Sequence, residues 1–163
     1  MQRDMKRMKL TVDNSVFELR AFDRNTLEKS FVWLNDTDIQ LGMNITYKVT
    51  KERQEQWFLG LAYRSDYKIW SFWCNNNEIG AGGFRNITGK SGELTCYIGD
   101  KNYWGTGKYL VDLLLLKAKE LRFNEVLLKV LHTNVRAYNC YLKRGFNQIA
   151  EDSLFKTMSI KII

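Results

Sequence analysis

Two short segments of this chain contain the residues whose types and spacing could do chemistry. The first, Tyr103–Tyr109, carries Gly105 and Gly107 directly before a stretch with helical periodicity. A glycine turn at a helix start directs several backbone N–H groups and the positive end of the helix dipole to one point, which suits phosphate oxygens. The segment therefore predicts a diphosphate-binding turn, with a plain strand-to-helix turn as the alternative.

The second segment, 134–146, places an amide at a helix start and a phenol two turns later. Asn134 follows an apolar stretch and can cap the helix, or its amide can reach a ligand. Ala137 is small enough for close approach, and Tyr141 lies on the same helical face as Asn134. A phenol with a pKa of about 10 stays protonated at neutral pH and can protonate a leaving thiolate. The alternative is a core tyrosine whose hydroxyl is satisfied.

Familiar nucleotide-binding motifs do not describe the first segment. A Walker loop requires glycine where Asn102 stands and serine or threonine where Tyr109 stands. A Rossmann fingerprint fails because its third glycine is lacking. A second glycine cluster, Gly80–Gly83, lies within a strand pattern, so close backbone approach or a bulge is favoured there over phosphate binding.

The composition is that of a globular protein with a basic surface. Of the 163 residues 45% are hydrophobic, and no apolar run approaches the ~18 residues of a membrane span. The net charge of +7 favours a polyanionic partner, either nucleic acid or a nucleotide-containing small molecule. Basic residues are dispersed, so we expect no nucleic-acid arm. Three cysteines without CxxC pairing, and no apolar signal sequence, favour a cytoplasmic protein with reduced thiols and no metal.

Alternating helix and strand patterns would position the two segments. Strands are expected at Val16–Phe22, Lys68–Cys74, Glu78–Ile87, Glu93–Gly99, Glu125–Leu131 and as a pair within Gln148–Ile163. Helices are expected from Asn25 to Leu34, Thr50 to Tyr63, Gly107 to Phe123 and Asn134 to Arg144. Residues 33–44 are expected to form an irregular loop, and residues 1–14 a short flexible or edge segment. The order predicts a single α/β (α+β) domain over residues 1–163, with about six or seven strands in a mixed sheet and about four helices on both faces.

The glycine turn followed by N-x-x-A-x-x-x-Y-x-K-x-G-F resembles the Gcn5-related N-acetyltransferases (the GNAT superfamily), over about Val16 to Ile163. The resemblance implies a sheet splayed between the fourth and fifth expected strands, with acetyl-CoA in the gap. It implies that the five backbone N–H groups of Gly105 to Tyr109 hold the pyrophosphate and that Tyr141 protonates the departing thiolate. The implied cofactor contacts are Ile98, Gly99, Trp104, Gly105, Thr106, Gly107, Lys108, Tyr109, Asn134, Ala137, Tyr141 and Lys143.

The chain departs from the family at the turn. The family pattern Q/R-x-x-G-x-G/A falls on 104–109, so Trp104 replaces the usual Gln or Arg and Tyr109 replaces a small residue. A Trp-Gly opening looks like the branch that acetylates ribosomal proteins. The effect of the bulky Tyr109 on phosphate geometry is left open by the sequence.

A narrower resemblance concerns the acceptor. Segments 31–35, 79–88 and 107–110 resemble N-acetyltransferases of UDP-4-amino-sugars in bacterial nonulosonic acid synthesis, which implies direct attack by the 4-amino group in a ternary complex. Trp33 and Tyr97 could stack on such an acceptor beside Asn35, although core packing is the alternative for the aromatic rings. A protein N-terminus or a polyamine is the alternative acceptor, which Asp36 and Asp38 would suit. A non-enzymatic acyl-CoA-sensing or nucleic-acid-binding module is a third reading.

The general base and the oligomeric state are left open by the sequence. Glu93 begins the central strand, where some relatives place a carboxylate. His132, the single histidine, has an intrinsic pKa of about 6.5. A water chain or the shifted pKa of the amine is the alternative, since positioning alone can lower the barrier by about 7 kcal/mol. A homodimer is compatible with the sequence.

Overall fold

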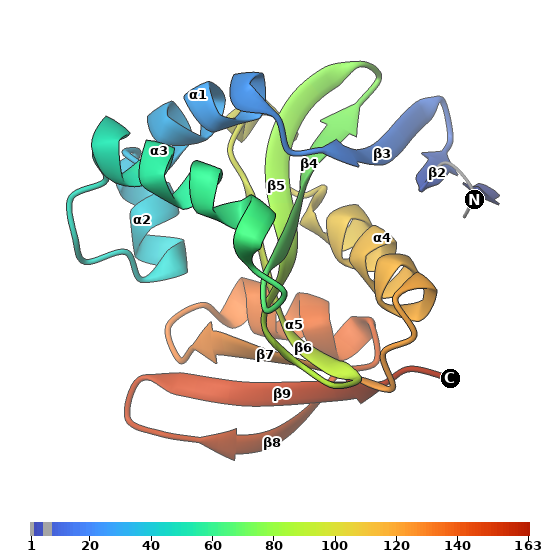
Figure 1. Ribbon diagram of the computed structural model, residues 1–163. Helices are drawn as coiled ribbons and strands as arrows, with labels where there is room; N and C mark the ends of the chain where they lie inside the picture. The colour runs from blue at the N-terminus through green and yellow to red at the C-terminus, as the bar shows by residue number, and fades with distance from the viewer. Residues whose placement is uncertain (1, 5–7) are drawn as a thin grey trace.

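The computed structural model describes residues 2–4 and 8–163, with side chains from residue 8 onward. Within these residues, nine strands form one sheet in the order β1-β2-β3-β4-β5-β6-β7-β9-β8 (Figure 1). The strands are β1 Gln2–Asp4, β2 Lys9–Val12, β3 Ser15–Ala21, β4 Lys68–Cys74, β5 Asn77–Thr88, β6 Ser91–Ile98, β7 Glu125–Leu131, β8 Asn147–Glu151 and β9 Phe155–Lys161. The helices are α1 Arg24–Trp33, α2 Thr37–Met43, α3 Lys51–Gly60, α4 Gly107–Glu120 and α5 Val135–Lys143, with short 3₁₀ turns η1 Leu61–Tyr63 and η2 Lys101–Tyr103.

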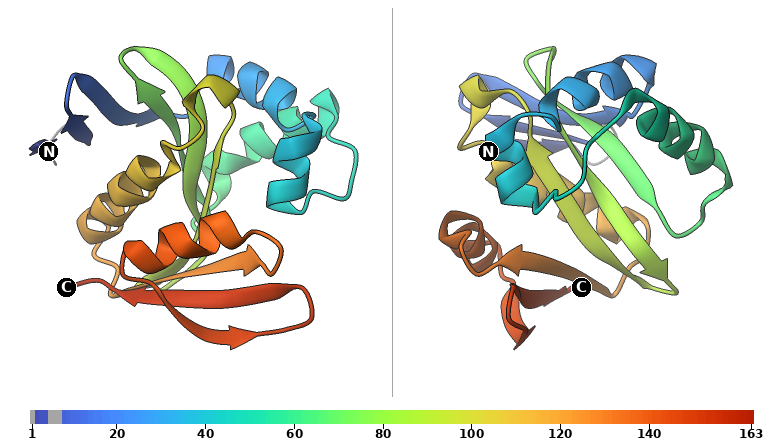
Figure 2. Two further views of the ribbon diagram at one scale, coloured as in Figure 1. Left: turned by 180° about the vertical axis from the view of Figure 1, so that it is seen from behind. Right: turned by 90° about the vertical axis from the view of Figure 1, so that its left-hand side faces the viewer.

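The strands β6 and β7 separate soon after they meet. They are parallel neighbours, and their pairing runs from Ser91 opposite Glu125 to Glu93 opposite Leu127. Beyond this point β6 continues to Ile98 and β7 to Leu131 without pairing to each other, and the right-hand view in Figure 2 shows the two arms diverging. These are the fourth and fifth strands that the sequence predicts, so the predicted splay is confirmed.

Alternation along β6 assigns its side chains to two faces of the sheet. Cys96 Sγ lies 3.7 Å from the hydroxyl of Tyr141 in α5. Tyr97 points to the opposite face, where its ring lies 6.2 Å from the ring of Trp33 in α1. Helices α4 and α5 therefore cover one face, and α1, α2 and α3 the other (Figures 1 and 2). The predicted placement of helices on both faces is confirmed.

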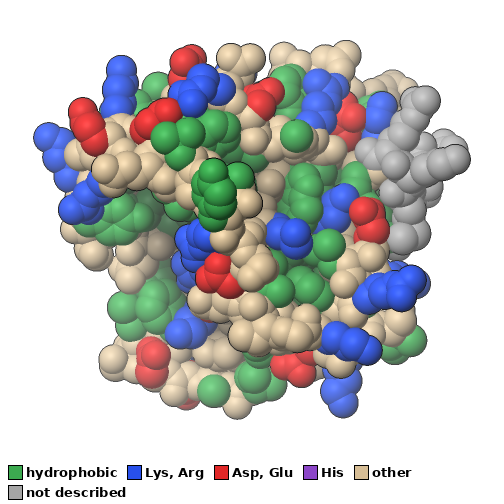
Figure 3. All heavy atoms as spheres, in the orientation of Figure 1, with side chains coloured by type: hydrophobic (Ala, Val, Ile, Leu, Met, Phe, Trp, Pro, Cys, Tyr) green, Lys and Arg blue, Asp and Glu red, His purple; other side chains and the backbone are tan. Residues whose placement is uncertain are grey.

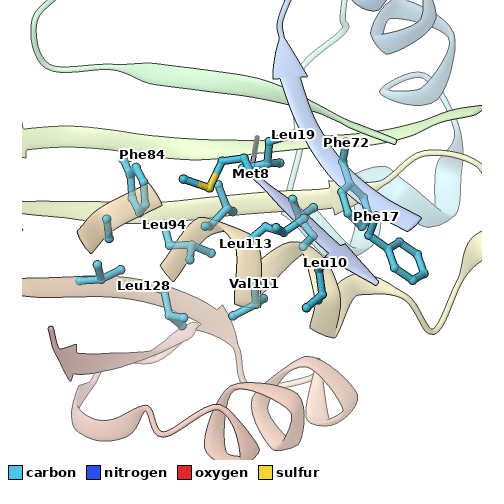
Figure 4. Close-up of a cluster of buried hydrophobic side chains, with 14 of the residues drawn as sticks. Met8, Leu10, Phe17, Leu19, Phe72, Phe84, Leu94, Val111, Leu113 and Leu128 are labelled. Carbon is cyan, nitrogen blue, oxygen red and sulfur yellow. The ribbon is translucent and has the colours of Figure 1, made fainter. Parts of the chain in front are cut away.

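The main core lies between α4 and the sheet. Leu110, Leu113 and Leu114 are fully buried at the helical spacing that the sequence predicts. Figure 4 shows that Leu10 and Phe17, from the N-terminal strands, join the same cluster. Burying a leucine or phenylalanine side chain contributes roughly 1.5–3 kcal/mol to folding, so this cluster anchors the helix that begins at the glycine turn.

Two predictions about the first third of the chain require correction or refinement. Residues 33–44 are not an irregular loop throughout, because 37–43 form α2, a fifth helix. Asp36 caps α2 by accepting a hydrogen bond from the backbone N–H of Asp38 at 2.9 Å, and Asn44 ends it in the left-handed conformation with φ 54°. Within the segment 1–14, residues 2–4 form the edge strand β1 and residues 9–12 form its neighbour β2, which raises the strand count above the expected six or seven.

The glycine cluster Gly80–Gly83 lies within β5, as the sequence predicts. A Cβ at Gly83 would lie 1.9 Å from the carbonyl oxygen of Lys68 in the neighbouring strand. This position therefore requires glycine because two backbones approach closely, not because a phosphate binds there.

Charged side chains are spread over the surface. On the face shown in Figure 3, Lys and Arg side chains are interspersed with acidic ones. None of the helices in the described part of the chain is both long enough and apolar enough to cross a lipid bilayer.

Candidate active site

A cavity of about 890 Å³ occupies the gap between β6 and β7. Its walls include 94–98 of β6 and 129–131 of β7, together with residues at the starts of α4 and α5. On the opposite face of the sheet, α2 contributes residues including Ile39 and Met43. The cavity therefore connects the two faces of the sheet through the splay.

The glycine turn presents free amides to this cavity. Gly105 has φ +99°, a left-handed conformation that favours glycine. Within the described residues, the backbone N–H groups of Gly105, Gly107 and Lys108 donate to no protein acceptor, whereas those of Thr106 and Tyr109 donate to carbonyl oxygens at 3.1 and 2.9 Å. Three of the five predicted amides are thus available at the start of α4, where the helix dipole also favours an anion.

The two residues that depart from the family pattern have structural roles. The Tyr109 ring stacks on Phe17 of β3, with ring centroids 4.6 Å apart, so its bulk packs against the core. Trp104 Nε1 donates a hydrogen bond to the carbonyl oxygen of Ile98 at 3.2 Å. The indole therefore ties the turn to the end of β6.

Basic side chains line the same cavity as the free amides. Lys108, Lys143 and Arg136 line the cavity on the face of α4 and α5. Arg136 Nη2 lies 3.5 Å from the position that a Cβ of Gly105 would take, so this guanidinium stands beside the turn. The sequence analysis missed Arg136. A cation in the first turn of a helix opposes the helix dipole, and that unfavourable placement was the signal available.

Asn134 and Tyr141 hold the positions that the sequence predicts on α5. Asn134 Oδ1 accepts a hydrogen bond from the backbone N–H of Ala137 at 3.2 Å and so caps the helix.

Burial raises the pKa of Tyr141 well above its ordinary value. Burial likewise raises the pKa of the neighbouring Cys96 thiol to about 11. The phenol therefore keeps its proton at neutral pH, at the wall of the cavity.

The two candidate bases do not line the cavity. Glu93 Oε2 accepts hydrogen bonds from Arg85 Nε at 2.6 Å and from Asn86 Nδ2 at 3.0 Å. His132 follows β7, and its Nε2 lies 2.7 Å from the carbonyl oxygen of Asp152. Both side chains are engaged with the protein, and neither lies among the residues that form the cavity wall.

Some of the remaining predicted site residues line the cavity, and the others contact neighbouring parts of the protein instead. Tyr97 lines the cavity, but Trp33 and Asn35 do not. The Trp33 ring covers Gly99, where a Cβ would come within 2.0 Å of it, and Asn35 Nδ2 donates to the carbonyl oxygen of Phe31 at 2.7 Å. Of the predicted cofactor contacts, the wall includes Ile98, Trp104, Gly105, Gly107, Lys108, Asn134, Ala137, Tyr141 and Lys143, but not Gly99, Thr106 or Tyr109.

A splayed sheet with free amides and the partly buried Tyr141 phenol at its gap is the arrangement that the resemblance to acetyl-CoA-dependent acetyltransferases implies. The chain belongs to the acetyltransferase (GNAT) family, whose model matches residues 20–146. Comparison with curated protein sequences gives no match. Within the described residues, no three His, Cys, Asp or Glu side chains lie together as a metal site would require.

Solved structures agree with this family. The chain is 25% identical to the Campylobacter jejuni N-acetyltransferase PseH in complex with acetyl coenzyme A, with a TM-score of 0.73, and the match covers 89% of this chain and 98% of that one. It is 19% identical to the spermidine N-acetyltransferase from Vibrio cholerae in complex with CoA and spermine, with a TM-score of 0.83 and coverage of 90% and 95%. A domain from Methanocaldococcus jannaschii DSM 2661 is 20% identical, with a TM-score of 0.80 and coverage of 90% and 99%. The protein is therefore an acetyltransferase that uses acetyl-CoA.

Proposed function

We propose that the protein transfers acetyl from acetyl-CoA directly to the 4-amino group of a nucleotide-linked amino-sugar, within a ternary complex. The observation that carries the proposal is one cavity with different chemistry on the two faces of the sheet. Free amides, cations and the Tyr141 phenol lie on the face of α4 and α5, and α2 closes the other face. The coenzyme and the amine would meet at the gap between β6 and β7.

The coenzyme would bind by its phosphates and its pantetheine arm. The amides of Gly105, Gly107 and Lys108 can donate to pyrophosphate oxygens, and Arg136 supplies a neighbouring guanidinium. The edge of β6 that faces the gap has lost its strand partner beyond Glu93. An extended amide-containing arm can take the place of that strand.

The transfer needs a neutral amine and a protonated leaving group. The amine nitrogen attacks the thioester carbonyl carbon, the C–S bond breaks, and Tyr141 donates its proton to the departing thiolate. Direct attack is favoured over an acyl-enzyme. Burial raises the pKa of both Cys96 and Cys140, so neither thiol supplies the thiolate that a nucleophile requires.

Removal of the amine proton is assigned to water in the cavity. Neither Glu93 nor His132 lines the cavity, and both side chains are already hydrogen-bonded to other groups of the protein. Their roles as bases stay predictions of the sequence, as do a cytoplasmic location and a homodimer. A water-mediated route uses the open volume of the cavity and needs no carboxylate or imidazole at the reacting nitrogen.

Charge supports an anionic acceptor over a polyamine. Asp36 and Asp38, the acids that would suit a polyamine, both bind Lys101 Nζ at 2.9 Å. Asp38 lines the cavity together with Arg85 and Lys129, but Lys101 already offsets the charge of Asp38 and leaves the two cations. A nucleotide diphosphate would neutralise these cations, whereas a polyamine would be repelled by them.

Acetyl transfer to a panel of amines tests the proposal. The protein would be incubated with acetyl-CoA and with UDP-linked 4-amino-sugars, spermidine and peptides, and products would be identified by mass spectrometry. We expect one acetyl group on a sugar nucleotide. Acetylation of spermidine or of a peptide N-terminus, but of no sugar nucleotide, would overturn the acceptor assignment.

A further inference from the structure

Arg85 is a cavity-lining cation that takes no part in the acetyl-transfer step itself. It lies near the end of β5, opposite Glu93 of β6, and its side chain is 48% exposed. Together with Thr95 of β6 it lines the cavity that α2 closes.

An irregularity in β5 fixes the direction of this side chain. The register between β5 and β6 shifts between Arg85 and Thr88, and Asn86 has φ 51°. Adjacent residues of a regular strand point to opposite faces, but here Arg85 and Asn86 both donate to the same oxygen of Glu93. Because of the bulge, Glu93 accepts hydrogen bonds from both Arg85 and Asn86, and the bond to Nε fixes the position of the Arg85 guanidinium.

The terminal nitrogens of Arg85 remain available. Within the described residues, Nη1 and Nη2 donate to no protein acceptor, whereas Nε is held at 2.6 Å. A guanidinium presents its N–H groups in a planar fork that matches two phosphate oxygens. The free part of Arg85 is therefore suited to an anion entering the cavity.

A second cation lies on the same face. Leu127 is the last β7 residue paired with β6, opposite Glu93, and Lys129 follows two residues later. Because alternate residues of a strand share a face, Lys129 projects on the side of Glu93 and Arg85, one step toward the open end of the gap. Lys129 also lines the cavity. Asp152 is the acidic group that interacts with it, at the turn between β8 and β9.

We propose that Arg85, assisted by Lys129, binds the diphosphate of the acceptor, and that Glu93 is a positioning residue for the Arg85 guanidinium. This inference rests on the proposed function, since it assumes an acceptor that carries phosphate. It assigns the acceptor phosphates to the face of α2, separate from the amides on the face of α4 that receive the coenzyme phosphates.

Arg85→Gln tests the assignment in steady-state kinetics. We expect the KM for a UDP-linked 4-amino-sugar to rise about 10- to 100-fold, the loss typical of a charge-assisted hydrogen bond, with the KM for acetyl-CoA unchanged. Arg24→Gln is the matched control, because Arg24 pairs with Glu55 at 2.9 and 3.0 Å and lies outside the cavity wall. Thermal melting of both variants reports on folding.

Glu93→Gln separates positioning from base catalysis. A positioning role predicts a higher acceptor KM with kcat unchanged at saturating acceptor and with the pH profile of kcat unmoved. A large fall in kcat with a displaced pH profile would show that Glu93 is the base and would overturn this part of the inference.

Calorimetry with UDP alone keeps the phosphate site testable even if the acceptor proposal fails. Binding of UDP by the wild-type protein with bound CoA, and its loss in Arg85→Gln, supports the site. Acetylation of a sugar nucleotide with an unchanged KM in Arg85→Gln would overturn the site and leave the proposed function intact. Acetylation of unphosphorylated amines only, together with no UDP binding by the wild type, would overturn both.

Discussion

The two faces of the sheet build their halves of the cavity in different ways. The face of α4 and α5 uses backbone amides at a helix start, from residues close together in sequence such as Gly105 and Lys108. The face of α1–α3 uses side chains brought together from distant strands, such as Arg85 of β5 and Lys129 of β7. Under the proposed function, coenzyme binding would therefore depend on chain conformation, whereas acceptor binding would depend on individual side chains.

This difference explains why the chain tolerates two departures at the glycine turn. Trp104 and Tyr109 replace the residues usual in the family, yet their side chains bond to Ile98 and stack on Phe17 while the turn keeps its free amides. A site made of backbone survives side-chain replacement provided the conformation is kept. A site made of side chains changes its specificity with a single substitution.

The largest expected effect is the loss of the Tyr141 hydroxyl. We expect Tyr141→Phe to lower kcat by about 10²- to 10⁴-fold, as for other general acids, while the Kd for CoA stays unchanged. Single-turnover kinetics and calorimetry with CoA measure the two quantities. An unchanged kcat would show that Tyr141 has only a packing role and that the face of α4 and α5 binds the coenzyme without providing a general acid.

A substitution within the turn tests whether coenzyme binding depends on backbone conformation. Gly105→Val forces a β-branched residue into φ +99°, which costs on the order of 1–3 kcal/mol or distorts the turn. We expect the Kd for acetyl-CoA to rise about tenfold or more, with the acceptor KM much less affected. Equal losses for both substrates would break the proposed division between the two faces.

Removing the Lys101 partner of Asp36 and Asp38, on the face of α1–α3, is expected to have a smaller effect on acceptor binding. Lys101→Met removes the partner of Asp36 and Asp38, so two negative charges appear beside α2. We expect the KM for an anionic acceptor to rise by a few fold, with the Kd for CoA unchanged, because exposed pairs contribute only about 1 kcal/mol. The same measurement in 0.5 M KCl serves as the control, since salt screens surface charges.

The smallest expected effect is the response of kcat to alkaline pH. Burial raises the pKa of Tyr141, so its acid form persists above the ordinary pKa of about 10. We expect kcat to rise as the acceptor amine loses its proton and to show no alkaline fall up to pH 10. A fall between pH 8 and pH 9 would contradict a buried, protonated Tyr141.

Local sequence signals predicted the face of α4 and α5 well. The apolar periodicity of α4 identified its buried leucines, and the position of Asn134 after an apolar strand identified the cap of α5. Each of these features is set by neighbours within a few residues. The splay followed from the family resemblance and is confirmed by the register.

The face of α1–α3 was harder to predict because its geometry depends on residues far apart in the sequence. Helix α2 has seven residues and was predicted as a loop, although Asp36 offered a cap signal. The direction of Arg85 depends on a bulge and on φ 51° at Asn86, which no hydrophobic period reveals. The closeness of Arg136 to Gly105 depends on how α5 packs beside α4.

The gap between β6 and β7 also bears on the order of events during turnover. The cavity at this gap is lined from both faces of the sheet. Under the proposed function, the coenzyme and the acceptor would enter from opposite faces, so neither would block the binding of the other. We therefore expect the two substrates to bind in random order, with each product competing only with the substrate that uses the same entrance.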